Sequence, residues 1–326
     1  MVKNYVVRRY QKEDFALWND FIGQAKNATF LFHRDFMEYH NDRFDDFSLM
    51  VFEGEKLVTV LPANRVGETI FSHQGLTYGG LVLSPKSKLS SVIAIFKTVL
   101  SFLHDNGILH FNLKQLPSFY CSHFADEIDY CMFIIKANLY RREALSLLDL
   151  TQKITFSKDR KKCIRRSLNA DLQIIEEPKF ELFWNEILLP NLDKKHQSKP
   201  VHSVEEIIKL HQHFPENIRH FNVYYNDKIV AGTTVFVAGN VAHPQYISGN
   251  EMKNELGSLD YLYDYLITNV FNDKKYFDFG PSHEENGTKI KEGILFWKES
   301  FGAKTITQSF YEVETKNHHL LDTVLI

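Results

Sequence analysis

The sequence is poor in cysteine, in excess positive charge and in long apolar runs, and each shortage excludes a class of protein. Its three cysteines, Cys121, Cys131 and Cys163, are odd in number and show no Cys-x-x-Cys spacing. This argues against a disulfide framework and a thiolate zinc site, so we expect no metal and a reducing, cytoplasmic compartment. The formal net charge of −3 gives no general attraction to phosphate polymers, so we expect no nucleic-acid partner.

The apolar stretches are too short for a membrane span. The most apolar one, Ser91 to Leu103, contains Lys97 and repeats its apolar residues at helical spacing. A span needs about 20 apolar residues, so we interpret this stretch as a core helix. Residues 1–9 turn to charge after two valines and lack the apolar run of about 7–15 residues of a signal peptide, so we expect none.

The length and composition predict two compact domains. The chain has 326 residues, of which 44% are apolar and 24% charged, as in ordinary globular proteins. Because domains usually hold about 150 residues, we predict one domain over residues 1–150 and a second over residues 151–326.

Two similar series of elements support this division. The first has a hairpin of residues 47–52 and 56–61, a helix over 89–104 and a strand over 108–113. The second has a hairpin of residues 221–225 and 228–237, then a strand over 241–248, a helix from 258 to about 271, a strand over 276–279, a helix from about 289 to 300 and a strand near 305–313. This order predicts an α/β fold in which each domain is a mixed, mostly antiparallel sheet flanked by helices, with a parallel pair around the crossover helix.

Two local features are candidate anion sites. The run from Ser157 to Arg166 is the one dense basic segment, and it is either a solvated helix face or a site for phosphate groups. Gly257-Ser258 stands at a predicted helix start, where free N–H groups and the helix dipole suit a diphosphate. The alternative is an ordinary helix capped by serine. The pattern is not a P-loop.

Three runs near the end of the chain carry a resemblance to a known family. They are Tyr276 to Gly287, Lys291 to Leu295 and Lys298 to Lys304. They resemble the C-terminal half of tandem-domain members of the GNAT acyltransferase superfamily, relatives of the Fem-type peptidoglycan aminoacyltransferases. The likeness extends upstream to His196, Lys199–His202, Phe214-Pro215, His243 and Gln245–Ile247, and it covers most of residues 151–313.

The resemblance is weaker in two places. In the first half, only the hairpin and Leu76–Leu81 are similar to the family. The superfamily's usual Gln/Arg-x-x-Gly-x-Gly/Ala loop is absent, and Asn254–Ser258 stands at its place.

The resemblance implies transfer of an acyl group from acyl-CoA, a co-substrate rather than a permanent cofactor, to an amine. A histidine suits the role of general base, because its pKa is about 6.5. His243 is the first candidate for catalysis, with Asp278 and His196 as others. The residues expected to bind the coenzyme are Tyr246, Ile247, Ser248, Gly257, Ser258 and Lys291. The residues expected to bind the acceptor are His202, Gln245, Ser282, Glu285, Tyr78 and His33.

The acceptor implied by the resemblance is a nucleotide-linked amino sugar for surface polysaccharides such as O-antigen or capsule. A 3-amino-3,6-dideoxyhexose on a dTDP carrier is the specific expectation. One alternative is a Fem-type transferase that uses aminoacyl-tRNA, although residues 151–217 leave no room for a long helical arm. Another is a non-catalytic GNAT-fold protein that binds acyl-CoA. The acyl chain, sugar stereochemistry and oligomeric state are not predicted.

Overall fold

The computed structural model describes residues 4–196 and 199–325, with the backbone alone at Lys195 and His196. The chain divides into two compact units, one of Met1–Glu143 with Thr307–Ile326 and one of Ala144–Ile306. The prediction assigned residues 151–326 to the second domain, whereas residues 307–326 pack with the first unit. The reason is a pairing between distant strands, from Phe310 opposite Lys114 to Glu314 opposite His110, which leaves no local signal in the sequence.

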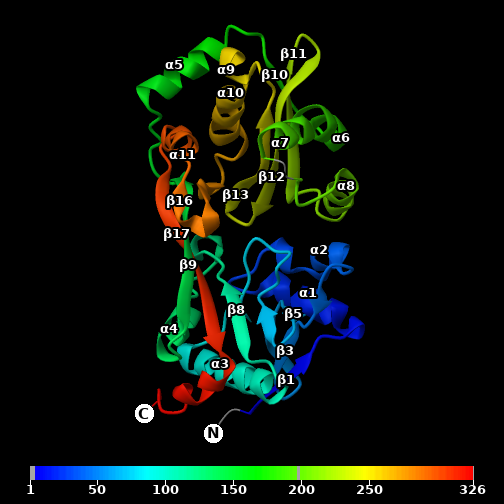
Figure 1. Cartoon of the computed structure of the whole chain (residues 1–326), viewed down its shortest axis with the longest axis vertical. Helices are drawn as coiled ribbons and strands as arrows, with labels where there is room; N and C mark the ends of the chain where they lie inside the picture. Colours follow the sequence, from blue (N-terminus) through cyan, green and yellow to red (C-terminus); the bar gives the residue numbers. More distant parts are fainter. Residues whose placement is uncertain (1–3, 197–198, 326) are drawn as a thin grey trace. The chain divides into compact units, whose positions relative to one another are not determined.

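The first unit holds two groups of strands and four α-helices (Figure 1). Its strands are β1 (Tyr5–Arg9), β2 (Asp45–Asp46), β3 (Leu49–Glu53), β4 (Lys56–Leu61), β5 (Asn64–Val66), β6 (Thr69–Phe71), β7 (Val82–Leu83), β8 (His110–Lys114), and parts of β9 (Asn138–Asp149) and β17 (Lys304–Glu314). Its helices are α1 (Phe15–Gln24), α2 (Arg34–Met37), α3 (Leu89–Asp105) and α4 (Glu127–Ile134), with short 3₁₀ turns η1 (Lys12–Asp14), η2 (Phe30–Phe32), η3 (Glu38–His40), η4 (Ser118–Tyr120) and η8 (Thr315–Leu321).

The strands of the first unit pair as β1-β3-β4-β7 and as β17-β8-β6-β5-β2. Helix α3 supplies much of the core, because its apolar residues recur at helical spacing, and side chains such as Val92, Phe96 and Val99 are fully buried. The helical turn η8 lies beside α3 (Figure 1), so the end of the chain helps to cover this core.

The second unit is a six-stranded sheet with helices. Its strands follow the order β10-β11-β12-β13-β14-β9. The elements not yet given are β10 (Gln173–Glu176), β11 (Ile218–Tyr225), β12 (Lys228–Ala238), β13 (Val241–Gly249), β14 (Tyr276–Pro281), β15 (His283–Glu284), β16 (Lys289–Ile290), α5 (Lys158–Ser167), α6 (Phe180–Phe183), η5 (Trp184–Leu188), α7 (Leu189–His196), α8 (Val204–His213), α9 (Lys253–Leu256), α10 (Ser258–Tyr265), η6 (Leu266–Val270), η7 (Glu285–Gly287) and α11 (Glu292–Glu299).

Local sequence explains the hairpin at the centre of this sheet. Asn226 and Asp227 both take positive φ, 48° and 60°, as a tight turn between β11 and β12 requires. Ten of the eleven residues of β12 are buried, which fits a central strand covered on both faces. Strand β13 pairs antiparallel with β12 and parallel with β14, and α10 with η6 forms the connection. The predicted mixed sheet with one parallel pair at this crossover is confirmed.

The predicted elements match the structure to within a few residues. The predicted helix over 89–104 is α3, and the predicted strands over 241–248 and 276–279 are β13 and β14. Within residues 4–196 and 199–325, no helix combines the length and apolar character needed to cross a membrane.

Candidate functional site

The candidate site of the second unit lies where two parallel strands separate. Strands β13 and β14 pair at only two positions, Val241 with Tyr276 and Ala242 with Phe277. Beyond these positions β13 follows β12 as far as Gly249. Strand β14 follows β9 instead, and one extra residue interrupts that pairing between Asp278 and Pro281. The residues that come next on the two strands, His243 and Asp278, therefore stand at the point of divergence.

The structure brings these two predicted catalytic residues together. His243 Nδ1 lies 3.1 Å from Asp278 Oδ2 and 3.0 Å from the Asp278 carbonyl oxygen. The His243 side chain is 14% exposed and that of Asp278 is 4% exposed. Because both neighbours of Nδ1 are acceptors, Nδ1 carries a proton and donates it. Nε2 is then the unprotonated nitrogen of the neutral ring, and it has no hydrogen-bond partner among the described residues.

A buried lysine holds the irregular part of β14. Lys298 of α11 is 7% exposed, and its Nζ donates to the carbonyl oxygens of Gly280 (3.0 Å) and Pro281 (2.6 Å). Burial lowers the pKa of Lys298 to about 8, while the charge of Asp278 acts in the opposite direction. The Asp278 carboxylate also accepts the Gly280 N–H at 2.8 Å. Lys298 and Asp278 thus fix the loop that faces His243.

Gly280 is required at its position for two reasons. Its φ is +69°, a region that L-residues with a side chain rarely adopt. A Cβ there would also lie 3.2 Å from His243 Cε1, closer than most contacts of real Cβ atoms. The glycine therefore lets the β14 backbone approach the imidazole.

Together these groups form an oriented histidine. A half-buried imidazole whose Nδ1–H is held by a buried carboxylate presents Nε2 as a proton acceptor of fixed direction. Among the residues that the structure describes, no group of three His, Cys, Asp or Glu side chains is placed to hold a metal ion.

Two other predicted residues meet in the interior of the second unit. Tyr246 Oη accepts the His202 backbone N–H at 3.1 Å and lies 2.5 Å from His202 Nδ1. Both residues are buried, and the Tyr246 ring packs edge-on against Trp184. The side chains of Tyr246 and His202 therefore pack in the core, and only the backbone of Tyr246 is a candidate for ligand contact.

The predicted diphosphate site at Gly257-Ser258 is covered by a helix. Gly257 faces α5 so closely that a Cβ would lie 3.2 Å from Ser167 Cβ and 3.3 Å from the Cys163 carbonyl oxygen. Ser258 is fully buried. The Arg160 guanidinium pairs with Asp260 in the first turn of α10, and Arg166 donates to the Asn254 carbonyl oxygen at 2.7 Å. Helix α5 therefore packs directly against this turn, a contact that has no local sequence signal.

This packing brings the basic run of the sequence beside the start of α10. Lys158, Lys161, Lys162 and Arg165 of α5 are exposed, whereas Arg160 is buried between Asp260 and the rings of Trp297 and Phe301. The exposed cations of α5 are therefore open to solvent.

The remaining candidates of the second unit have varied surroundings. Gln245 is the extra residue of a bulge in β13, between the partners of Thr234 and Val235. Ile247 is 39% exposed, and Ser248 Oγ accepts from Asn191 Nδ2 at 2.8 Å. Lys291 pairs with Glu284 at 2.5 Å, and exposed Glu285 pairs with Lys289 at 2.6 Å. The Ser282 hydroxyl is buried and has no hydrogen-bond partner within the described chain.

Two of the remaining candidates belong to the first unit, and the side chain of the third is outside the described part of the chain. The buried Tyr78 hydroxyl lies 3.1 Å from Thr29 Oγ1 in the first unit. His33 belongs to the same unit, and burial lowers its pKa, against the effect of Asp35. His196 ends α7, and its side chain lies outside the described part of the chain.

Sequence reasoning missed Lys298 and Gly280 as members of the site. No sequence signal marks Lys298, since a lysine that is buried on a helix with exposed Ile294 and Phe296 contradicts the usual arrangement of apolar and charged residues. Its position in the sequence alone does not reveal that burial. The contact of Gly280 with His243 arises only from the separation of the two strands.

Comparisons with known proteins identify the fold. No family model matches the sequence, and no curated protein matches it either. Among solved structures, FemX is similar over 97% of this chain and 99% of its own, with a TM-score of 0.65 and 8% identity. L-PGS from Bacillus licheniformis matches 98% of this chain and 95% of its own (TM-score 0.57, 13% identity).

A tandem GNAT protein from the clavulanic acid biosynthesis pathway is similar over 96% of this chain and 99% of its own, with a TM-score of 0.51 and 11% identity. These likenesses extend over both units. The chain therefore has a tandem GNAT-like, Fem-like fold.

Proposed function

We propose that this protein is an N-acyltransferase that moves an acyl group from acyl-CoA to a primary amine. The observation that carries the proposal is the His243–Asp278 pair at the divergence of β13 and β14. In open α/β sheets, ligands commonly bind beyond the carboxyl ends of parallel strands that separate. Amine acylation needs an oriented proton acceptor close to the attacking nitrogen.

The proposed step balances without a further reactant. An amine arrives as an ammonium and loses a proton to Nε2 of His243. The amine nitrogen then forms a bond to the thioester carbon, and the C–S bond breaks. The leaving thiolate takes up a second proton, which the attacking nitrogen loses as the amide forms, and His243 releases its own proton to solvent. The products are the amide and free coenzyme A. Asp278 accepts a hydrogen bond from His243 Nδ1–H throughout the reaction and stabilises the imidazolium that forms.

The coenzyme would contact two parts of the second unit. We place its pantetheine arm along the backbone of Tyr246–Ser248, next to exposed Ile247. Its phosphates would bind the exposed cations of α5, such as Lys161, Lys162 and Arg165, because α5 occupies the turn at Gly257. The exposed cations of α5 thus take the role that the sequence suggested for the turn at Gly257-Ser258.

For the acceptor we propose a nucleotide-linked amino sugar, with a dTDP-linked 3-amino-3,6-dideoxyhexose as the first compound to test. The support is the sequence resemblance of residues 276–304, with its Asp278-Phe279-Gly280 and Lys298–Gly302 runs. Such products serve surface polysaccharides, including O-antigen and capsule.

The test is a measurement of thiol release from acetyl-CoA and longer acyl-CoAs against a panel of amino sugars and nucleotide-linked amino sugars. His243→Gln should lower kcat by roughly 10²–10⁴-fold, because a general base is lost. His213→Gln, at an exposed histidine of α8, is the matched control and should retain full activity. Charge reversal at Lys161 and Arg165 should raise KM for the coenzyme while kcat stays near wild type.

The same assay separates the alternatives. Transfer only from aminoacyl-tRNA would support a Fem-type donor, a possibility raised by the likeness to FemX. Binding of acyl-CoA with no thiol release for any amine would make the protein a binding module. Equal activity of the His243 and His213 variants would reject the proposed site.

A further inference from the structure

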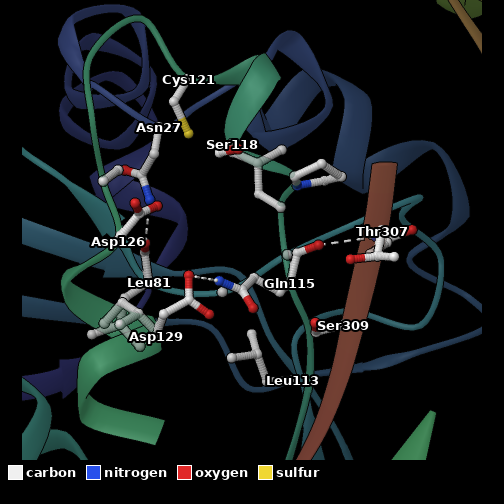
Figure 2. A pocket seen from close by; sticks show the side chains of 17 residues that line it. Asn27, Leu81, Leu113, Gln115, Ser118, Cys121, Asp126, Asp129, Thr307 and Ser309 are labelled. Atoms are coloured by element: carbon white, nitrogen blue, oxygen red, sulfur yellow. Dashed lines mark hydrogen bonds between the residues drawn. The ribbon is translucent and has the colours of Figure 1, made fainter. Parts of the chain in front are cut away.

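The first unit contains a cavity that is lined by none of the residues of the His243 site. It measures about 210 Å³ and is formed entirely by residues of that unit. Figure 2 shows residues from four parts of the chain around it: Asn27 after α1, Leu81, the segment from Leu113 to Asp129, and Thr307 with Ser309 of β17.

The cavity lies where two parallel segments of the first unit separate. Strands β6 and β8 pair in parallel from Thr69 opposite His110 to Phe71 opposite Asn112, and a last parallel bridge joins Gly79 to Gln115. Beyond that bridge, residues 82–83 of β7 pair with β4 instead. This is the same kind of divergence as that of β13 and β14.

The backbone edge at this divergence is already hydrogen bonded by the chain itself. Asn27 Nδ2 donates to the Leu81 carbonyl oxygen at 2.8 Å, and Asn27 Oδ1 accepts the Leu83 N–H at 2.7 Å. The Lys26 N–H donates to the Leu83 carbonyl oxygen at 3.0 Å. An extended ligand arm cannot form strand-like hydrogen bonds with these groups unless it displaces the Lys26-Asn27 segment.

The space that remains is acidic. Of the described residues that line it, the charged ones are Asp126 and Asp129. Asp129 Oδ2 accepts from Gln115 Nε2 at 2.7 Å, as Figure 2 shows, and Oδ1 has no hydrogen-bond partner among residues 4–196 and 199–325. Asp126 is exposed at the start of α4. The lining also offers the hydroxyl groups of Ser118, Thr307 and Ser309.

Nearby cations do not neutralise this lining. The Lys26 ammonium is 4% exposed and pairs with Glu127 at 2.5 Å, and it also donates to the Phe124 carbonyl oxygen at 3.1 Å. Arg142 is exposed, donates to the hydroxyl of the lining residue Ser309 at 3.4 Å and acts to lower the pKa of Asp129. Burial raises the pKa of Asp129 and the charge of Asp126 acts in the same direction, whereas the hydrogen bond from Gln115 and the charge of Arg142 lower it.

We infer that this cavity binds a compact, hydroxylated ligand that carries a positively charged primary amine. The ammonium would lie between Asp126 and Asp129, and the hydroxyl groups would meet Gln115 and the serine and threonine side chains. Ligand pockets for larger molecules usually measure about 300–1,000 Å³, so the volume suits a single amino sugar rather than a nucleotide or coenzyme A. Phosphates would be repelled by the two carboxylates.

The inference is tested by binding to the full-length chain with no acyl donor present, which makes it independent of the proposed reaction. Calorimetric titration with glucosamine should give at least tenfold tighter binding than titration with N-acetylglucosamine, which lacks the charge. Asp129→Asn and Asp126→Asn should each weaken glucosamine binding about tenfold. Asp105→Asn, at an exposed position ending α3, is the matched control and should leave binding unchanged.

Thermal unfolding of each variant shows that it is folded, and Asp126→Asn keeps the test decisive because Asp126 is exposed. Equal binding of glucosamine and N-acetylglucosamine would overturn the inference, as would unchanged binding in both cavity variants or no binding at millimolar amine. Loss of acetyl-CoA binding in the Asp129 variant would also overturn it, since the cavity would then be a coenzyme site.

Two sources of the amine remain to be separated. If Asp129→Asn raises KM for the acceptor amine, the cavity holds the acceptor of the reaction. If glucosamine binds but KM for the acceptor is unchanged in that variant, the ligand is a separate effector. Either result supports an amine site in the first unit.

Discussion

The two units separate a pair of parallel segments in the same way but surround the gap with different chemistry. In the second unit, His243 and Asp278 stand at the divergence, and Lys298 holds the loop beside them. In the first unit, Lys26 and Asn27 take up the exposed strand edge, and Asp126 and Asp129 line what is left.

This difference shows that the arrangement of the strands alone does not determine which ligand binds where two parallel strands separate. Where two parallel strands separate, backbone N–H and C=O groups at the strand edge have no neighbouring strand to bond. The segments that pack against that edge decide whether these groups bond to a ligand or to the chain itself.

The largest expected effect concerns Lys298. Its pKa falls from 10.5 to about 8 in the folded protein, so between these values the unfolded chain binds more protons and stability rises with pH. The variant Lys298→Met lacks this gain. From pH 8 to 10.5, the unfolding free energy of the wild type should therefore rise by about 3 kcal/mol relative to that of the variant.

Denaturant unfolding across this pH range checks the prediction. Lys289→Met is the control, because Lys289 is exposed and its pair with Glu285 contributes little. Parallel stability curves for wild type and Lys298→Met would mean that Lys298 keeps an ordinary pKa.

The second effect concerns Asn27, whose side chain is hydrogen bonded to the strand edge beside the cavity of the first unit. Asn27→Ala removes both side-chain hydrogen bonds to Leu81 and Leu83 and leaves buried backbone groups without partners. We expect a loss of about 2–3 kcal/mol in unfolding free energy. Asn106→Ala removes one exposed hydrogen bond to Phe102 and should cost well under half as much. If the two variants lose similar stability, the Asn27 bonds do not hold the edge.

The smallest effect concerns Gly280. Gly280→Ala and Gly239→Ala both place a Cβ on a residue with positive φ, and each should cost about 1 kcal/mol of stability. Only Gly280 faces His243, so only its variant should also lower kcat, by about tenfold. Stability is read from thermal unfolding and kcat from thiol release. Equal kcat values in the two variants would show that the approach to His243 has no role.

Local patterns predicted the elements well. The hairpin of β3 and β4, the core helix α3 and the crossover from β13 to β14 all follow from side-chain periodicity and turn residues close in the sequence. His243 and Asp278 were named from their residue types and from the family resemblance. Their contact depends on two strands that are separated by a whole helix.

The failures were non-local. The turn at Gly257-Ser258 has the composition of an anion site. Helix α5, which lies almost a hundred residues earlier in the chain, packs against this turn. His202 was expected at the acceptor, yet its imidazole pairs with the Tyr246 hydroxyl in the core. Burial of a polar pair is decided by what packs around it, and a single sequence carries little record of that.

By itself, the sequence determined where helices and strands form and that their order repeats, because those preferences act between residues a few positions apart. Only the tertiary structure decided which strand edges stay open and that the last strand completes the first unit. It also decided that Lys298 is buried against the Gly280-Pro281 loop, which faces His243. These outcomes come from packing between distant segments, where burial changes the pKa of a charged group and close approach excludes a side chain.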